Sequence, residues 1–444
     1  MAATSHSSSI ITFMYDRQGA ATSLDMQREL NLSQPTLSRS LAAMVREGKI
    51  LRLGAARQSI YLLPAPDAGV AILVPIMRVD EAGDIQPFGQ LTPLVGGRYC
   101  VEFNQGLNAV KHKIYGGLPW FLSDMRPQGF LGRLFSRKYP ALTLDLNPLK
   151  WHDKDIVRAL VSHGEDLPGN LLLGHQAFDQ FLLMRGASPH GVAKSDYSAI
   201  AQSVLSGAPA GSSAGGEQPK FCATRVDGRA VIVKFSPLDD SPAASRWRDL
   251  SICEHIALTT LRENGLAAAV STLHLDDRIY LEVERFDRTD NGRIGMVSLE
   301  AFDNEYIGQL DTWDRTAERA LSRGLLNTTD ARNLQCLEAF GRLIANTDRH
   351  YCNVSLIRQD SQWRLAPAYD MLPMFYAPVS GEVIDRQYDI ATLQPTLDTL
   401  SVWPEALKLA SLFWRRVRAD KLISAEFQLR LANDWDAWLA TRPL

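Results

Sequence analysis

The most informative side chains in this sequence are an acid and an amide that lie five positions apart. Asp348 and Asn353 belong to the stretch IANTDRHYCNVSL, between two apolar runs. A positioned aspartate can accept or orient a hydroxyl proton, and an asparagine oxygen can bind a hard cation such as Mg²⁺. The later motif APAYDMLP supplies a second carboxylate, Asp370. We therefore expect Asp348 to act as a base, and Asn353 and Asp370 to be magnesium ligands.

A lysine on an apolar strand is the second candidate for chemistry. The run RAVIVKF predicts a β-branched strand with Lys234 near its end. A buried ammonium without an anionic partner costs several kcal/mol, so an ATP phosphate is a natural partner for it. The helix predicted from RWRDLSICEHIALTTLRENGL carries Glu254, which is either the residue that orients Lys234 or a solvated surface acid.

A small-residue tract precedes this strand. The sequence SVLSGAPAGSSAGGEQPK contains Ser213, Gly215 and Gly216, and its backbone NH groups could surround a phosphate. Such tracts are also flexible linkers, so this one is informative only together with the lysine strand after it. Further on, RIYLEVERFDR predicts a strand that runs into a connection. We expect Glu284 and Phe286 to contact a nucleotide base there, although an edge strand facing water would have a similar pattern.

The order of these pieces favours phosphoryl transfer. An Asp and an Asn five residues apart occur in the catalytic loop of protein kinases, after a glycine-rich loop and a strand lysine and before a second magnesium carboxylate. A polar loop with turn-forming Asp and Asn would explain one piece, but not all of them in this order. His350 could contact phosphate or bond to the backbone; the sequence does not separate these roles.

The elements at the N-terminus predict a separate winged helix-turn-helix domain. Thr22 and Asp25 form a capping-box pattern, and Ser33 can cap a second helix whose apolar stripe faces a core. Two short strands around a glycine turn would form the wing. The side chains that we expect to contact DNA are Gln34, Thr36, Ser38 and Arg39 on the second helix and Arg52 and Arg57 on the wing. A helical module for protein contacts is the alternative.

Charge and composition agree with this division. Residues 1–66 contain seven Lys or Arg and four Asp or Glu, a net charge of +3, whereas the whole chain of 444 residues has −3. A basic segment on an acidic body points to nucleic acid as the partner of that segment alone. The five cysteines form no CxxC pair, which argues against a disulfide framework or a cysteine zinc site. We also expect neither secretion nor a membrane span, and hence a cytoplasmic protein that is nucleoid-associated when bound to DNA.

The motifs SAGGEQPK, VIVKFSP, EVERFDR, TDRHYCNVS and PAYDMLP resemble the HipA family of bacterial serine/threonine kinase toxins. LPWFLSDMRPQGFLGR and DLPGNLLLG extend the likeness over most of residues 69–444. Because of its N-terminal helices, the chain is most similar to the longer branch with a fused helix-turn-helix, the YjjJ or HipH type. Arg349 departs from the pattern, since relatives often have glycine there.

The resemblance implies ATP and Mg²⁺ as cofactors and an α+β fold: a winged helix-turn-helix at residues 1–66, an N-terminal lobe at 67–286 and a helical C-lobe at 287–444. It implies Asp348 as the base, Lys234 on the ATP phosphates, and Ser213 as an autophosphorylation site. A phosphate on Ser213 would expel the loop and abolish ATP binding.

The resemblance also implies partners. They are a protein substrate, such as an aminoacyl-tRNA synthetase or another translation factor, and a separate HipB-like antitoxin, although the fused domain could replace the latter. DNA and a homodimer are expected from the N-terminal domain. Two alternatives stay open: a nucleotide-sensing transcription regulator, and a metal-dependent nuclease that uses Asp348 and Asp370 on DNA.

Overall fold

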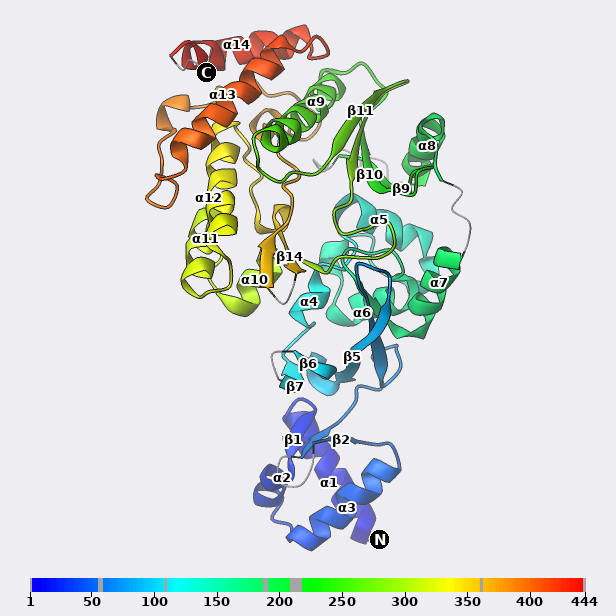
Figure 1. The fold of residues 1–444 in the computed structure, drawn as a ribbon. Helices are drawn as coiled ribbons and strands as arrows, with labels where there is room; N and C mark the ends of the chain where they lie inside the picture. The colour runs from blue at the N-terminus through cyan, green and yellow to red at the C-terminus, as the bar shows by residue number, and fades with distance from the viewer. Residues whose placement is uncertain are drawn as a thin grey trace.

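The computed structural model describes residues 2–54, 59–107, 110–186, 191–207, 218–359 and 362–441 of the chain. Helices and antiparallel sheets alternate along it, so the fold is of the α+β type. The N-terminus lies at one end of the molecule and the C-terminal helices lie at the other (Figure 1). None of the helices within the described ranges is long and apolar enough to cross a membrane.

The N-terminal unit (residues 2–63) combines helices with a small antiparallel sheet of order β1-β3-β2. Its elements are α1 (Ala2–Asp16), β1 (Ala20–Thr22), α2 (Ser23–Glu29), α3 (Gln34–Arg46), β2 (Leu51–Leu53) and β3 (Ile60–Leu62). The predicted helix starts are confirmed. The Thr22 hydroxyl accepts from the Asp25 amide at 3.2 Å, and Ser33 accepts from the Thr36 amide at 3.4 Å. Leu37, Leu41 and Met44 of α3 face the core, as their helical spacing predicts.

The middle unit comes next, with a five-stranded antiparallel sheet of order β7-β6-β5-β4-β8. Its strands are β4 (Val74–Val79), β5 (Ile85–Leu94), β6 (Arg98–Leu107), β7 (Val110–Tyr115) and β8 (Leu171–Leu173). The helices are α4 (Trp120–Ser123), α5 (Gly129–Lys138), α6 (Asp153–His163) and α7 (Gly174–Gly186). The next helix, α8 (Tyr197–Gly207), packs on the second sheet through Tyr197 and Ala201. α6 packs on the sheet through Ile156, Val157 and Leu160, which join a core with Ile76 and Leu91.

A second sheet, of order β11-β12-β10-β9, belongs to the candidate site. It is formed by β9 (Lys220–Thr224), β10 (Ala230–Phe235), β11 (Ser271–Leu275) and β12 (Ile279–Glu284), with α9 (Pro242–Glu263). The residues predicted as one N-terminal lobe, 67–286, therefore contain two sheets with separate cores.

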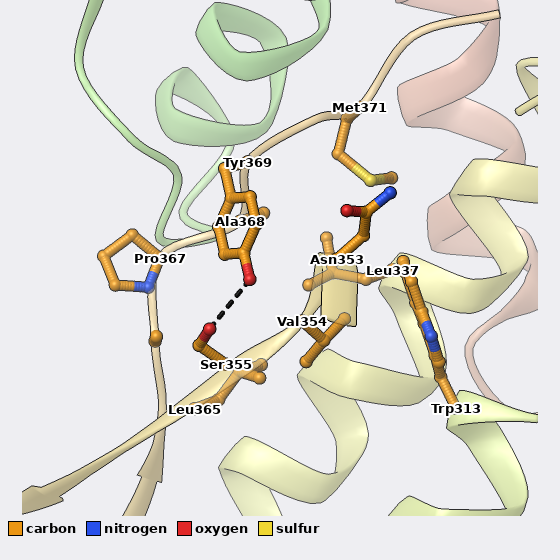
Figure 2. Close-up of a pocket in the computed structure, with 11 residues that line it drawn as sticks. Trp313, Leu337, Asn353, Val354, Ser355, Leu365, Pro367, Ala368, Tyr369 and Met371 are labelled. Carbon is orange, nitrogen blue, oxygen red and sulfur yellow. Dashed lines mark hydrogen bonds between the residues drawn. The ribbon is translucent and has the colours of Figure 1, made fainter. Parts of the chain in front are cut away.

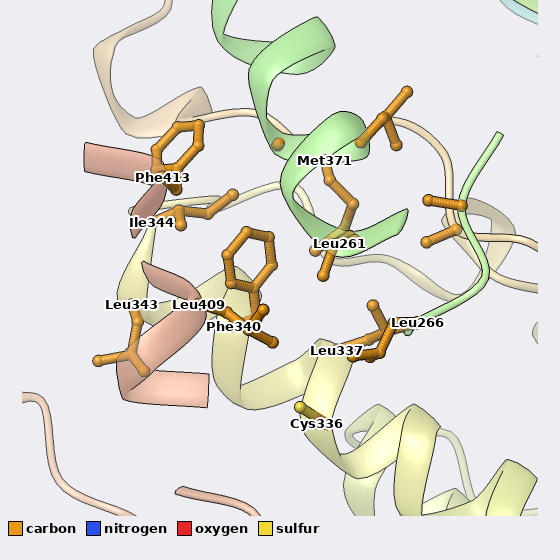
Figure 3. Close-up of a cluster of buried hydrophobic side chains, with 14 of the residues drawn as sticks. Leu261, Leu266, Cys336, Leu337, Phe340, Leu343, Ile344, Met371, Leu409 and Phe413 are labelled. Carbon is orange, nitrogen blue, oxygen red and sulfur yellow. The ribbon is translucent and has the colours of Figure 1, made fainter. Parts of the chain in front are cut away.

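The C-terminal part is mainly helical. Its elements are β13 (Met296–Ser298), α10 (Leu299–Tyr306), α11 (Trp313–Ser322), α12 (Thr328–Leu343), β14 (Ser355–Gln359), β15 (Gln362–Leu365), α13 (Trp403–Ala419) and α14 (Ala425–Ala440). Phe340 of α12, Phe413 of α13 and Leu261 of α9 meet in its core (Figure 3). The C-terminal tryptophans belong to the same core, since all four are buried: Trp403, Trp414, Trp435 and Trp438.

The N-terminal unit and the middle sheet share apolar contacts. Leu62 packs with Leu94 and Cys100 in one cluster, and Val95 belongs to the core of the N-terminal unit. The backbone continues the contact, because Pro64 bridges Leu94 and the Val95 amide donates to the Leu63 carbonyl at 3.2 Å. The segment that starts at Pro64 is thus attached to the middle sheet at its first residues.

This shared core predicts the effect of Leu94→Ala. Leu94 is 1% exposed, so the substitution removes packing between both units and should lower the free energy of unfolding by about 2–5 kcal/mol. Chemical denaturation measures it. The matched control is Leu397→Ala at a side chain that is 92% exposed, with an expected change below about 0.5 kcal/mol. Equal effects of the two substitutions would show that the contact between the units contributes nothing.

Candidate active site

Lys234 is the buried centre of the candidate site. It lies on β10, and its ammonium donates to both carboxylate oxygens of Glu254 on α9 at 2.8 Å. It also forms an ion pair with Asp370, which follows β15. The Lys234 and Glu254 side chains are 9% and 1% exposed. The expected pairing of Lys234 with Glu254 is confirmed, and the surface alternative for Glu254 is excluded.

The charges in this group are unequal, with one ammonium between two carboxylates. Burial alone would lower the pKa of Lys234, but Asp370 and Glu254 outweigh it and raise that pKa. Burial would likewise raise the pKa of Asp370, yet Lys234 and Lys220 hold it at about 2. For Glu254 burial dominates, and its pKa is raised. The three side chains carry a formal charge of −1, which the nearby ammonium of Lys220 offsets.

The backbone at Asp370 is in the left-handed region, with φ of +56°. Aspartate tolerates this conformation better than most residues, but it still has to be held by its surroundings. The nearby Ala368 supplies that support: its amide donates to Ala267, and its carbonyl accepts from Ala269, both at 2.9 Å. This conformation places the Asp370 carboxylate beside Lys234.

The loop with Asp348 begins after α12 and is held by asparagines on both sides. The Asp348 amide donates to the side chain of Asn346 at 3.0 Å. Asn353 then donates its Nδ2 to the Asp348 carbonyl at 2.9 Å and lies 3.5 Å from the Asp348 carboxylate. Because the amide nitrogen is used in this way, the Asn353 oxygen is left as the acceptor, as a metal ligand requires.

Asp348 itself is half exposed, and its pKa is raised. Burial is the main cause, and the charge of Asp370 adds to it, whereas His350 opposes it. The Nε2 atom of His350 lies 3.8 Å from the Asp348 carboxylate. The other ring nitrogen, Nδ1, accepts from the Cys352 amide at 3.2 Å. Of the two roles expected for His350, the structure shows the hydrogen bond to the backbone. The same ring also faces the Asp348 carboxylate.

Two tyrosine hydroxyl groups connect the loop that carries Asp348 to neighbouring parts of the chain. The Tyr351 hydroxyl contacts Thr316 of α11 at 2.7 Å and accepts from the Asp311 amide at 2.9 Å. The Tyr369 hydroxyl bonds to Ser355 at 2.7 Å (Figure 2). It also donates to the Cys352 carbonyl at 2.9 Å. Tyr369 immediately precedes Asp370, so the same side chain connects the two loops that carry Asn353 and Asp370.

Arg349 is a positioning residue that the sequence did not reveal. Its Nε donates to the buried Glu338 of α12 at 3.1 Å, and its guanidinium also contacts the Asn346 carbonyl. Gly341 leaves the space for this side chain, because a Cβ there would collide with Arg349. The ion pair between Arg349 and Glu338 therefore attaches the residue that follows Asp348 to α12.

The site opens into a cleft of about 910 Å³ and an adjoining pocket of about 280 Å³. Lys220, Lys234, His350, Asn353 and Asp370 line both, whereas Asp348 lines the smaller one. Ile232 and Val283 line the cleft on the side of the second sheet. The opposite wall comes from the middle unit, mainly from α5 and residues 163–168. The cleft is within the range of volumes that bind small molecules.

Glu284 and Phe286 lie at the exit of β12, as expected, and both line the cleft. The Glu284 amide donates to the Val270 carbonyl at 2.8 Å, and its carboxylate binds Arg229 at 2.8 Å. A contact between Glu284 and a nucleotide base would therefore use the backbone carbonyl of Glu284. Phe286 stacks on Tyr369 with ring centroids 5.7 Å apart, which gives the cleft an aromatic floor.

An arginine cluster joins this exit to the middle unit. Arg285 binds Asp287 through two bonds of 3.0 Å, and Arg288 reaches Asp166 at 2.9 Å. The Asp287 carboxylate also accepts from the Gly169 amide at 2.9 Å. Burial would raise the pKa of Asp287, but Arg285 and Arg288 hold it at about 2. The cluster stays charged and keeps residues 166–169 against the cleft.

The other expected site residues fall into two groups. Ser213, Gly215, Gly216 and Arg57 are outside the described residues. The remaining ones belong to the N-terminal unit: Gln34, Ser38 and Arg39 are exposed, Thr36 is bonded to Ser33 at 2.9 Å, and Arg52 donates to Ser59 at 2.9 Å.

The oxygen ligands available in the site fit magnesium better than a metal ion that is coordinated by protein side chains alone. Within the described ranges, no cluster of three or more His, Cys, Asp or Glu side chains is arranged for a metal ion. Mg²⁺ commonly binds through one or two protein oxygens together with phosphates and water. Asn353 and Asp370 offer such oxygens, and both line the cleft and the smaller pocket.

Comparisons with known proteins agree with this geometry. Residues 71–182 match the model of the YjjJ-like toxin middle domain, and residues 212–419 match that of the HipA-like C-terminal domain. The chain is 35% identical to Toxin YjjJ of Escherichia coli (strain K12) over 425 residues, which is 93% of each protein.

Two solved structures match this chain at lower similarity. HipA of Shewanella oneidensis MR-1, solved with HipB and its operator DNA, is 16% identical and gives a TM-score of 0.45, with 82% of this chain and 94% of that chain covered. The Helicobacter pylori proinflammatory kinase CtkA is 15% identical and gives 0.34, with 49% and 85% covered. Scores this low do not establish a shared fold, so the sequence matches decide the assignment.

The raised pKa of Asp348 predicts a pH-dependent gain in stability for Asp348→Asn. An acid whose pKa rises on folding destabilises the folded state when it is ionised. The variant should therefore be more stable than wild type at neutral pH, and the difference should shrink as the pH falls through the folded pKa towards the ordinary value of 3.8. Denaturant unfolding at several pH values measures this, with Asp67→Asn at an exposed turn as the control. A difference that grows towards acidic pH would contradict the assignment.

Proposed function

The chain belongs to the family of YjjJ-like toxins with a HipA-like C-terminal domain, and on this basis we propose that it is an ATP- and Mg²⁺-dependent protein serine/threonine kinase. The observation that supports this most directly is the ion-paired Lys234 and Glu254 in the same cleft as Asp348, Asn353 and Asp370. A nuclease would need no buried lysine with an orienting glutamate, and a pure sensor would need no base at Asp348.

In this proposal the protein positions the reactants and moves one proton. The acceptor hydroxyl enters the smaller pocket, and Asp348 takes its proton as the oxygen bonds to the terminal phosphorus of ATP. The bond from that phosphorus to the bridging oxygen breaks, and ADP leaves. The raised pKa of Asp348 makes it a better base than an ordinary aspartate. Lys234 binds the phosphates. Mg²⁺ held by Asn353 and Asp370 would stabilise the charge that develops on the phosphate oxygens.

The base and the loop that precedes β9 complete the nucleotide site in this proposal. Ile232 and the Phe286–Tyr369 stack would pack against the adenine base of the nucleotide, and backbone groups of residues 284–286 would contact its edge. The tract with Ser213, Gly215 and Gly216 covers the phosphates, and Ser213 is the autophosphorylation site. A phosphate on Ser213 would displace the tract and switch the enzyme off.

We also propose that the N-terminal unit is a winged helix-turn-helix domain that binds DNA. Its supporting features are the N-cap at Ser33, the exposed Gln34, Ser38 and Arg39 at the start of α3, and the β2–β3 pair. The helix start is where a recognition helix contacts base edges. A homodimer on a two-fold operator, a HipB-like antitoxin and a translation factor as the substrate are further proposals from the family likeness.

Phosphate transfer from γ-labelled ATP with Mg²⁺ tests the kinase proposal. Wild type should label itself, with the label on Ser213, or label a protein in cell extract. Asp348→Asn should reduce the rate about 10²- to 10⁴-fold, because a positioned base contributes that much. The Asp67→Asn variant should keep the wild-type rate.

The alternatives give different results in parallel assays. ATP binding without transfer to any protein would contradict the kinase and leave the sensor. DNA strand breaks with Mg²⁺ but without ATP, lost in Asp348→Asn, would indicate the nuclease.

The DNA proposal predicts that losing an arginine near the start of α3 weakens DNA binding more than losing one at the end of that helix. Arg39→Ala should weaken binding to duplex DNA of mixed sequence about tenfold and reduce the salt slope by about one, because a phosphate contact is lost. Fluorescence anisotropy at several salt concentrations measures both. Arg46→Ala is the control, because Arg46 lies at the other end of the same helix. Equal losses in both variants would place the DNA elsewhere.

A further inference from the structure

One stretch of the middle unit is strongly basic, although the chain as a whole is acidic. Residues 125–144 contain four Arg or Lys side chains and no Asp or Glu, whereas the whole chain has a net charge of −3. This stretch includes α5, which lies in the wall of the cleft opposite the second sheet. Three of its cations line the cleft: Arg126, Arg137 and Lys138. Charge of one sign gathered in a cleft attracts ligands of the opposite sign.

The helix α5 leads from the smaller pocket into the cleft. Residues 128–131, at its start, line the smaller pocket together with Asp348, and its last residues line the cleft. Burial raises the pKa of Cys352, in the loop that carries Asp348, and the charge of Arg126 opposes this rise, so Arg126 lies close to that loop. A helix of ten residues is about 15 Å long, and an extended chain covers about 3.3 Å per residue. A peptide that runs along α5 from Asp348 therefore has its fourth or fifth residue beside Lys138.

An aromatic stack fixes the end of α5. The rings of Tyr139 and His163, the last residue of α6, stack with centroids 3.6 Å apart, and Phe135 packs on Tyr139 at 4.8 Å. The Lys138 ammonium lies 5.2 Å from the centroid of the Tyr139 ring. Lys138 is exposed, but its position at the cleft is thus defined by rings that belong to two helices.

The acidic side chains on this wall already have donors within the protein, whereas two of its cations have no acidic partner. The acids and their donors are Asp124 with the Ser298 amide at 2.6 Å, Glu165 with the Gln180 side chain at 2.8 Å, and Asp166 with Arg288 at 2.9 Å. Arg126 and Lys138 form no ion pair with any residue in the described part of the chain. The Nε atom of Arg126 is buried and has no hydrogen-bond partner within the described ranges. These two side chains are therefore the charges that an incoming ligand meets.

We propose that this wall binds an acidic segment of the protein substrate, an inference that rests on the proposed kinase function. The acceptor serine or threonine enters the smaller pocket beside Asp348. Arg126 pairs with an acidic residue next to the acceptor, and Lys138 pairs with one that is four or five positions away. The nucleotide lies against the opposite wall, at Ile232 and Phe286. Substrate and nucleotide thus use the two walls of one cleft, and the phosphate passes between them.

Fluorescence anisotropy with labelled peptides, the full chain, Mg²⁺ and AMP-PNP tests this assignment. The probes are two peptides of about 13 residues with one central serine among Ala and Gly. They differ only at the first, fourth and fifth positions on each side of the serine, which are Glu in one and Gln in the other. Wild type should bind the Glu peptide about tenfold more tightly, and this preference should shrink as the salt concentration rises.

Substitutions on the wall should change the preference and leave the affinity for the Gln peptide as it is. Lys138→Ala and Arg126→Ala should each reduce the preference about three- to fivefold, as expected for the loss of one partly exposed ion pair. Lys154→Ala is the matched control, because Lys154 is exposed on the neighbouring α6 and does not line the cleft. If Arg126→Ala does not fold, Arg126→Gln replaces it under the same criteria.

Three outcomes would overturn the assignment. The first is equal affinity of wild type for both peptides. The second is an equal loss for both peptides in Lys138→Ala, which would mean that the helix only supports the cleft. The third is single-stranded RNA that displaces the Glu peptide with higher affinity, which would assign the wall to nucleic acid.

Phosphate transfer to the same two peptides separates this inference from the proposed function. Wild type that prefers the Glu peptide but transfers no phosphate would contradict the kinase and leave the acidic-peptide site. Transfer to both peptides at equal kcat/KM would contradict the site and leave the kinase.

Discussion

The ion pairs of Lys234 are the interaction on which the rest of the site depends. They join β10, α9 and the loop after β15, three elements that are distant in the sequence. Burying an ammonium is tolerable only with carboxylates beside it, and a buried carboxylate needs the ammonium equally. Removal of Lys234 would therefore leave two carboxylates without their cation, so the second sheet, α9 and the loop after β15 have to assemble together for all three charges to be paired.

Charge also connects the middle unit to the cleft. Arg285 and Arg288 bind Asp287 on their own segment and Asp166 on the middle unit. This cluster places residues 163–168 and α5 as the wall opposite Ile232 and Val283. The middle unit in turn shares the Leu62, Leu94 and Cys100 cluster with the N-terminal unit. The chain is thus a series of units in which each junction buries either apolar side chains or paired charges, with the cleft at the second junction.

Local signals in the sequence predicted the features that depend on near neighbours. Thr22 and Ser33 marked helix starts because capping is a contact over three residues, and Lys234 implied a buried anion because an apolar strand surrounded it. The spacing of Asp348 and Asn353 placed them in one loop. The sequence did not predict the contact of Arg349 with Glu338, because this contact depends on the space that Gly341 leaves for the Arg349 side chain. The pair of Lys234 with Asp370 and the wall formed by the middle unit escaped as well, because both arise from contacts over more than a hundred residues.

The pairing of Asp370 with Lys234 has a thermodynamic consequence for a site that takes both a nucleotide and a cation. Each partner of the resting pair is the natural contact of one ligand: Lys234 suits phosphate, and Asp370 suits a metal. A ligand that arrives alone must compete with the internal ion pair, so its intrinsic affinity is reduced by the stability of that pair. Once phosphate has taken Lys234, Asp370 is released for the cation without further cost. Under the proposed function the two ligands would therefore bind with positive cooperativity, and by linkage each would increase the affinity for the other by the same factor.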